Sequence, residues 1–104
     1  MNGRSFRAAL ITKGRKTGKE HCVFLKAVMY NDMVYFSRHE PNSDWYKNAL
    51  NDERVFVEFD NKRHSGKARA ITDKELLRKI SRLKYPGEDR AEEKRVAIEI
   101  VLNY

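Results

Sequence analysis

The sequence predicts a mainly β protein of the α+β class, a six-stranded antiparallel barrel with two or three flanking helices. Three observations carry this prediction. Apolar and polar residues alternate over most of the first 70 residues, paired turn-forming residues separate these stretches, and two helical patterns interrupt them. Because an open antiparallel sheet leaves edges that pair with other chains, six strands in so short a chain are expected to close on themselves.

Three strands are expected at the start of the chain. The first covers residues 5–12, and a glycine-containing turn follows it. The second covers residues 20–30 and is apolar enough to be mostly buried. Asn31 and Asp32 both tolerate positive φ and therefore predict a two-residue hairpin turn. The third strand then returns over residues 33–37.

A helix interrupts the strands after Pro41. Asn42 or Ser43 is expected to cap its first turn, because short polar side chains accept hydrogen bonds from the free N–H groups there. The helix is expected to run to about residue 50. Its inner side would carry Trp45, Ala49 and Leu50.

A second hairpin follows this helix. Strict alternation over residues 54–60 predicts the fourth strand. Asp60 and Asn61 predict another tight turn, and residues 62–71 form the return strand. Gly66 interrupts the return strand and predicts a bulge there.

The last part of the chain predicts one more helix and one more strand. Thr72 and Glu75 have the spacing of a capping box, with Thr72 as the cap. Leucine and isoleucine then recur at helical spacing as far as residue 83, and Pro86 ends the helix. Alternation over residues 96–102 predicts the sixth strand.

Length and composition predict a single domain, residues 1–104, with a basic surface. There are 22 Lys and Arg against 15 Asp and Glu, a net charge of +7, which suits phosphorylated cofactors, nucleic acid or other anions. The lone Cys22 excludes an intramolecular disulfide and indicates a reducing compartment. No apolar run nears the length of a membrane span, so a cytoplasmic protein is expected.

The densest chemistry lies in the turn between the first two predicted strands. It holds two glycines, a hydroxyl and three cations, in the order Gly14, Arg15, Lys16, Thr17, Gly18, Lys19. Glycine lets the backbone adopt positive φ and approach a ligand, while Arg and Lys neutralise phosphate or carboxylate charge. The turn is therefore a candidate anion site, although a solvated basic hairpin carries the same residues.

Two segments together resemble the deazaflavin-dependent nitroreductase family. The first is Gly-Arg-Lys-Thr-Gly-Lys at residues 14–19, and the second is Trp-Tyr-Lys-Asn-Ala-Leu-Asn-Asp-Glu-Arg-Val at residues 45–55. The resemblance extends over residues 8–86. It implies the split β-barrel of flavin-binding proteins, related to pyridoxamine-phosphate oxidases, and a homodimer.

The resemblance also implies an oxidoreductase that transfers hydride to a small conjugated acceptor, a quinone-like or nitro compound. The implied cofactor is the 5-deazaflavin coenzyme F-420, with FMN as the alternative. Because the cofactor carries the chemistry and the protein orients it, no catalytic side chain is expected. Matching the motifs position by position implies that Tyr85 faces the substrate and that the cofactor contacts are Arg15, Lys16, Thr17, Lys19, His21, Ser37, Arg38 and Trp45.

A second class of function stays open beside the oxidoreductase. A non-catalytic module could hold a flavin-type cofactor, or bind nucleic acid through its basic surface. The nucleic-acid reading requires exposed aromatic residues among the cations. Tyr35 and Phe56 are the candidates, and they form no evident platform, which disfavours it. No spacing of His, Cys and carboxylates resembles a set of metal ligands.

Overall fold

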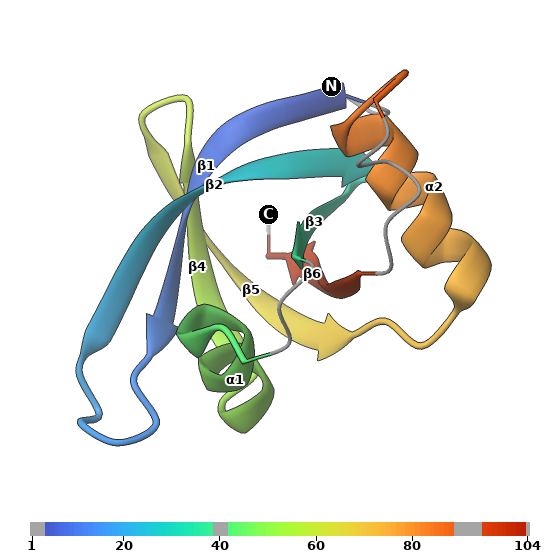
Figure 1. Ribbon diagram of the computed structural model, residues 1–104. Coiled ribbons are helices and arrows are strands. Elements are labelled where there is room, and N and C mark those ends of the chain that lie inside the picture. Colours follow the sequence, from blue (N-terminus) through green and yellow to red (C-terminus); the bar gives the residue numbers. More distant parts are fainter. Residues whose placement is uncertain (1–3, 39–41, 89–94, 104) are drawn as a thin grey trace.

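The computed structural model describes residues 4–38, 42–88 and 95–103, and it confirms the predicted six-stranded antiparallel barrel with two helices (Figure 1). The strands follow the order β1-β2-β3-β6-β5-β4 around the barrel, and β4 closes on β1. The elements in chain order are β1 (Arg4–Lys13), β2 (Glu20–Tyr30), β3 (Met33–Arg38), α1 (Asp44–Asn51), β4 (Arg54–Phe59), β5 (Lys62–Ala70), α2 (Lys74–Lys84) and β6 (Val96–Leu102).

The two helices cover different parts of the barrel. Figure 1 shows α1 across its lower end and α2 along its right side. Helix α1 packs against β1, β5 and β6, whereas α2 packs against β1, β2 and β3. The turn between β1 and β2 extends beyond the barrel at lower left, on the same side as α1.

Both predicted hairpin turns are confirmed. Asn31 and Asp32 have φ values of 51° and 61°, and Asp60 and Asn61 have values of 53° and 60°. Two consecutive residues with positive φ twist the turn in the same sense as the strands that it connects. The local sequence therefore sets the register of both hairpins.

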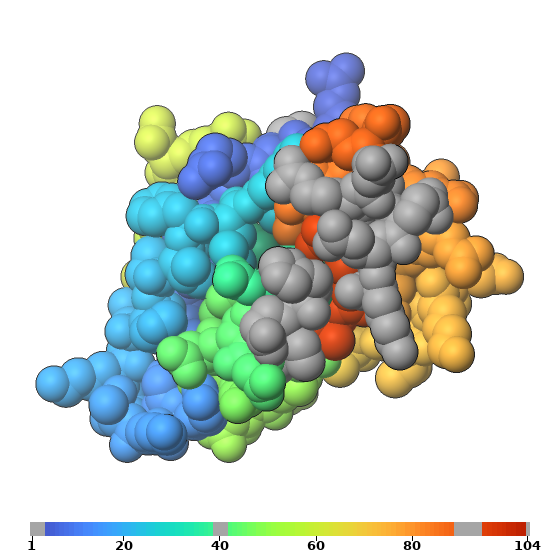
Figure 2. Space-filling view, viewed as in Figure 1, coloured from blue at the N-terminus to red at the C-terminus, as the bar shows by residue number. Residues whose placement is uncertain are grey.

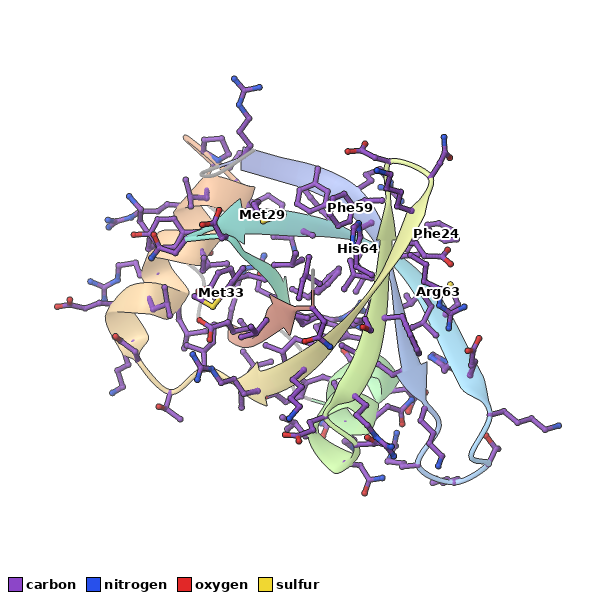
Figure 3. All side chains as sticks on the ribbon, turned by 180° about the vertical axis from the view of Figure 1, so that it is seen from behind. Phe24, Met29, Met33, Phe59, Arg63 and His64 are labelled. Carbon is purple, nitrogen blue, oxygen red and sulfur yellow. The ribbon has the colours of Figure 1, made fainter. Side chains whose placement is uncertain are left out.

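The hydrophobic core has two layers. The larger layer fills the barrel, and Trp45 and Ala49 of α1 close its end. The smaller layer lies between the barrel wall and α2, where Val28 and Tyr35 pack against Ile80. The two labelled methionines in Figure 3 belong to different layers. Met29 is part of the barrel layer, and Met33 lies toward α2 in the smaller layer.

Helix α1 differs from the prediction at its inner face. Ser43 is the residue before the helix, as expected, but its side chain makes no capping hydrogen bond. Trp45 and Ala49 are buried, whereas Leu50 is 48% exposed, so its placement on the inner side was wrong. Leu50 directly follows Ala49, and a step of one residue turns the side chain about 100° around the helix.

Helix α2 begins one residue later than predicted. Asp73, not Thr72, is the N-cap, and its carboxylate accepts hydrogen bonds from the backbone N–H groups of Glu75 and Leu76. The capping-box prediction was therefore wrong in its cap residue. An ionised carboxylate is a stronger acceptor for these N–H groups than a hydroxyl, and it also interacts favourably with the helix dipole.

The predicted bulge at Gly66 is absent from the described pairing. Gly66 pairs in register with Val55 on one side and Leu102 on the other. A Cβ atom at this position would lie 2.8 Å from Cγ2 of Ile100 and 2.8 Å from the carbonyl oxygen of Val101. Glycine is required here because β6 approaches closely, and not because the strand bends.

Polar side chains from three adjacent strands form a chain of hydrogen bonds on the outer side of the barrel. The hydroxyl of Tyr35 on β3 donates a 2.5 Å hydrogen bond to Glu99 on β6, and Arg69 on β5 donates to the other oxygen of the same carboxylate at 2.5 Å. Burial, followed by the hydrogen bond to Glu99 and its negative charge, raises the pKa of the Tyr35 hydroxyl. The carboxylate is thereby shared between a neutral donor and a cation.

Candidate functional site

The glycine turn between β1 and β2 is held by its own hydrogen bonds. Gly14 N–H donates to the carbonyl of Lys19 at 2.8 Å, and Gly18 N–H donates to the carbonyl of Gly14 at 2.8 Å. Gly18 has φ of +73°, which closes the turn in the left-handed region. The Thr17 hydroxyl accepts from Lys19 N–H at 3.2 Å. The turn thus has a defined backbone conformation that its own hydrogen bonds hold.

Helix α1 fixes the position of Arg15. Oδ1 of Asn48 accepts the backbone N–H of Arg15 at 3.2 Å and its Nη1–H at 2.8 Å. The amide group of Asn48 donates in turn to the hydroxyl of Thr12 at 3.4 Å. Nη2 of Arg15 pairs with Asp44 at 3.2 Å. Arg15 therefore has a defined orientation, and part of its charge is balanced by Asp44.

A cavity of about 220 Å³ lies between this turn and α1, and we call it the turn cavity. It brings together four of the predicted cofactor contacts. Its lining residues are Gly14, Arg15, Lys16, Thr17, His21, Asp44 and Asn48. Lys19 is exposed and is not among these residues. Four predicted contacts thus lie around one cavity, and Asp44 adds an acidic side chain to its lining.

A second cavity of about 300 Å³ lies where the end of β3 meets the end of α2, and we call it the basic cavity. It holds three further predicted site residues, Ser37, Arg38 and Tyr85. The other described residues that line it are Arg7, Phe24, Leu25, Lys26, Lys84 and Arg95. Seven predicted site residues are thus divided between two cavities, whereas Lys19 and Trp45 line neither, Trp45 being part of the barrel core.

Strand β2 connects the two cavities. His21 lines the turn cavity and Phe24 lines the basic cavity, about 10 Å further along at the usual rise of a β-strand. Figure 2 shows the corresponding face, with the β1–β2 turn in blue at lower left, α1 in green beside it and α2 in orange at upper right. Of the predicted cofactor contacts, His21 lies on β2, and the others lie on the glycine turn, on β3 and on α1.

A comparison with protein families decides the identity of the chain. The sequence model of the family described as F-420H(2)-dependent quinone reductase matches residues 2–103. The chain belongs to this family. The predicted resemblance to deazaflavin-dependent reductases is confirmed, and the family makes the chain a deazaflavin-dependent oxidoreductase with coenzyme F-420 as its cofactor.

Solved structures show the same split-barrel fold. A conserved hypothetical protein from Mycobacterium tuberculosis is 20% identical, with a TM-score of 0.74 over 97% of this chain and 74% of that one. An F-420-H2-dependent reductase is 20% identical, with a TM-score of 0.72 over 91% and 93%. A structure described as a domain-swapped dimer is 20% identical, with a TM-score of 0.73 over 91% and 79%. No curated protein matches.

Two buried polar atoms near the end of β3 fit a cofactor of this family. Oγ of Ser37 and Nε1 of Trp45 are buried and have no hydrogen-bond partner among the described residues. Trp45 packs beside Phe36, the residue that precedes Ser37. An unsatisfied buried donor or acceptor is costly, so such atoms mark places where a ligand can complete the hydrogen bonding. Trp45 shares the barrel interior with Phe36, whereas Ser37 is on the opposite face of β3, so a ligand group could complete the hydrogen bonding of either atom but would not meet both at one point.

Several residues of the site were missed from the sequence. Asp44 and Asn48 lie one helical turn apart on α1 and hold Arg15, and the signal for them was their i, i+4 spacing beside Trp45. Lys26, Lys84 and Arg95 lie in the basic cavity. No local pattern distinguishes them from other surface cations, because only the barrel brings their strands and helix together.

The aromatic residues that a nucleic-acid interface would need do not form an exposed platform. Tyr35, one of the two aromatic candidates for a nucleic-acid platform, is buried under α2. The other, Phe56, has the guanidinium of Arg63 over its ring, 4.1 Å from the centroid. Within the described ranges, no three His, Cys, Asp or Glu side chains lie close enough to hold a metal ion. Over the same part of the chain, no helix has the length and apolarity needed to cross a membrane.

Proposed function

We propose that this family member transfers hydride from the reduced deazaflavin to a small conjugated acceptor of the quinone type, with the phosphate group of the cofactor in the turn cavity. The observation that carries the proposal is the fixed Arg15 between the glycine turn and Asn48. A guanidinium that is already oriented loses little side-chain freedom when it meets a phosphate. Lys16, Thr17 and His21 line the same cavity and add donors to it.

The ring of the cofactor is proposed to lie along β2 toward the end of β3. Oγ of Ser37 would complete its hydrogen bonding with the polar edge of the ring, Arg38 would face it from the end of the strand, and Trp45 would wall the site. When bound, the reduced deazaflavin supplies a hydride, and the acceptor takes that hydride together with a proton from water. The protein side chains bind and orient both molecules. Tyr85 is proposed to contact the acceptor.

The fluorescence of the single tryptophan tests the proposal directly. Trp45 is the only tryptophan of the chain and lies beside the proposed ring site, so its emission should respond to a bound cofactor. Coenzyme F-420, FMN and single-stranded DNA are titrated in parallel. We expect saturable quenching with coenzyme F-420 and weaker or no saturation with FMN and DNA. A lack of saturation with both flavin-type cofactors would exclude the proposed function.

A pair of variants then locates the phosphate. Replacing Arg15 and Lys16 together by alanine should weaken cofactor binding about tenfold or more, since a charge-assisted hydrogen bond contributes about 1.5–3 kcal/mol. The matched control replaces Lys62 and Lys74 by alanine, because both are exposed lysines outside the two cavities. An equal loss in both double variants would indicate a general charge effect and would place the phosphate elsewhere.

A homodimer in a reducing, cytoplasmic compartment is part of the proposal. Phe24 is 68% exposed and Phe56 is also exposed, and these rings lie on the strands that flank β1. Figure 3 shows Phe24 on the outer side of the barrel. A second copy would remove such apolar surface from water. Light scattering tests it, and a monomer at the concentrations of the activity assay would contradict it.

A further inference from the structure

The turn cavity has a charge balance that one acidic residue sets. Arg15 and Lys16 contribute two cations to its lining, and Asp44 contributes one carboxylate. Over the described residues that line the cavity, with histidine counted as neutral, the net charge is +1, which is two cations less one carboxylate. The cavity is therefore less basic than the turn of residues 14–19 alone, because Lys19 lies outside the lining and Asp44 lies within it.

Asp44 contacts the guanidinium that a bound phosphate would use. Its Oδ1 accepts from Nη2 of Arg15 at 3.2 Å, while Nη1 of Arg15 donates to Oδ1 of Asn48 at 2.8 Å. A guanidinium has five N–H donors, so these two contacts leave three of them for a ligand. A phosphate that binds Arg15 thus comes close to the carboxylate of Asp44, and the two negative charges repel each other.

The charge of a phosphate group determines how well it matches this balance. The attraction of an anion to the cavity grows in proportion to its charge, whereas the cost of removing the anion from water grows with the square of its charge. A single negative charge matches the net charge of the described lining. A second negative charge on the same group adds repulsion from Asp44 and a larger desolvation cost, and it exceeds what this lining balances.

Two classes of phosphate differ by this one charge near neutral pH. A phosphate monoester, the group in FMN, has a second pKa of about 6 and is mostly a dianion at pH 7.5. A phosphate diester has an ester bond in place of that second acidic oxygen and stays a monoanion. Coenzyme F-420 carries its phosphate as a diester, because a further group is joined to it. The two candidate cofactors therefore bring different phosphate charges to the turn cavity.

We propose that the turn cavity selects a phosphate diester over a phosphate monoester, and that Asp44 is the residue that sets this selectivity. The inference rests on the proposed function, because it names the class of phosphate that the same cavity accepts. Arg15 and Lys16 attract either class, and Asp44 disfavours the second charge of a monoester. The lining that binds coenzyme F-420 thereby discriminates against FMN.

Two matched probes test the selectivity without a turnover assay. 5-Deazariboflavin 5′-phosphate and its monomethyl ester share the ring and the ribityl chain and differ in one ionisable oxygen, and quenching of Trp45 fluorescence on the full chain gives both dissociation constants. We expect the methyl ester, a diester, to bind about threefold to tenfold more tightly at pH 7.5, the effect of one unit of charge beside a largely exposed carboxylate. At pH 5 both probes are monoanions, and the preference should disappear. Equal affinity at pH 7.5 would overturn the inference.

Two substitutions that change the charge of the lining in opposite directions assign the preference to this cavity. Asp44→Asn raises the net charge by one and should reduce the preference for the diester to near unity or reverse it. Lys16→Gln lowers the net charge by one and should increase the preference while it weakens the binding of both probes. Asp60→Asn is the matched control, because this exposed aspartate lies outside the turn cavity, in a hairpin turn whose positive φ asparagine also tolerates. An unchanged preference in Asp44→Asn would contradict the assignment.

The ratio of the two affinities separates selectivity from a structural role of Asp44. Asp44 is also the first residue of α1, where a carboxylate interacts favourably with the helix dipole, and it pairs with Arg15. Loss of a purely structural contact would weaken the binding of both probes alike and leave their ratio unchanged. His21 lines the same cavity, and at pH 5 its protonation acts on both probes alike, because they then carry the same charge.

Titration of coenzyme F-420 distinguishes failure of the inference from failure of the proposed function. Saturable binding of the cofactor together with equal affinity for the two probes would overturn the inference and leave the proposed function standing. Binding of the cofactor without binding of the diester probe would also overturn the inference, because the cavity would then recognise a part of the cofactor other than its phosphate. A chain that binds none of the three molecules would exclude the proposed function, and the inference with it.

Discussion

Asn48 of α1 accepts two hydrogen bonds from Arg15 through one oxygen, one from the backbone and one from the guanidinium group. Its amide group donates to Thr12 on the other side. The side chain thereby ties the glycine turn to both α1 and β1. Asn48 is a positioning residue, since it sets where the cation of the turn lies.

Replacing Asn48 by alanine should therefore weaken cofactor binding about tenfold, although Asn48 is not proposed to touch the phosphate. Arg15 loses its orientation and regains side-chain freedom. Loss of three hydrogen bonds in a buried setting should also lower the free energy of unfolding by about 1–3 kcal/mol. Calorimetric titration and urea denaturation measure the two effects. Asn51→Ala, at the exposed end of the same helix, is the control and should change neither.

Replacing Asp44 by asparagine should have the opposite effect on binding. Its carboxylate lines the turn cavity and pairs with Arg15, so it repels a bound phosphate and competes for the guanidinium. We expect several-fold tighter binding of inorganic phosphate and of the cofactor at low salt, with the gain reduced at high salt. Weaker binding would mean that the pair is needed to orient Arg15.

The Tyr35–Glu99 hydrogen bond predicts a stability loss at alkaline pH. Burial raises the pKa of Tyr35 in the folded state, so above about pH 10 the unfolded chain releases this proton while the folded chain keeps it. The free energy of unfolding should then fall with pH, by at most about 1.4 kcal/mol per pH unit from this group. Urea denaturation at pH 9, 10 and 11 measures the slope. Tyr35→Phe should flatten it relative to wild type, and identical slopes would contradict the assignment.

Close packing at Gly66 predicts a large effect of one methyl group. Gly66→Ala should destabilise the fold by about 1–3 kcal/mol, because the new Cβ meets Ile100 and the backbone of Val101 at 2.8 Å. Thermal and urea unfolding measure the change. Lys67→Ala tests the neighbouring exposed position of the same strand and should be close to neutral. A stable Gly66→Ala variant would show that β6 can move outward.

The sequence predicted most of the fold because most of its signals are local. Alternation located the strands, and Asn31-Asp32 and Asp60-Asn61 located two hairpin turns, since positive φ is a property of the residues themselves. The predictions that were wrong concern features that depend on contacts between elements distant in the sequence. The predicted bulge at Gly66 is wrong because the sequence of β5 alone does not show the close approach of β6. Leu50 is exposed although it was expected on the inner side, because the buried residues of α1 are Trp45, Asn48 and Ala49.

The candidate site was predictable to the extent that it is contiguous in the sequence. The glycine turn is one segment, and its first four residues, 14–17, line one cavity. The basic cavity draws on residues from Arg7 to Arg95, and no motif joins them. The spacing of Asp44 and Asn48 places them on one side of α1, but it does not show that they hold Arg15, because they approach the turn only where α1 packs on the end of the barrel.

The separation of the two cavities along β2 has a kinetic consequence. With the phosphate in the turn cavity and the ring near Ser37, as proposed, Tyr85 is left to the acceptor, so an acceptor would enter and depart while the cofactor stays bound. Steady-state kinetics should then show intersecting lines, the pattern of a ternary complex, rather than the parallel lines of a ping-pong scheme. The formation of a ternary complex would thus follow from the separation of the two cavities along β2.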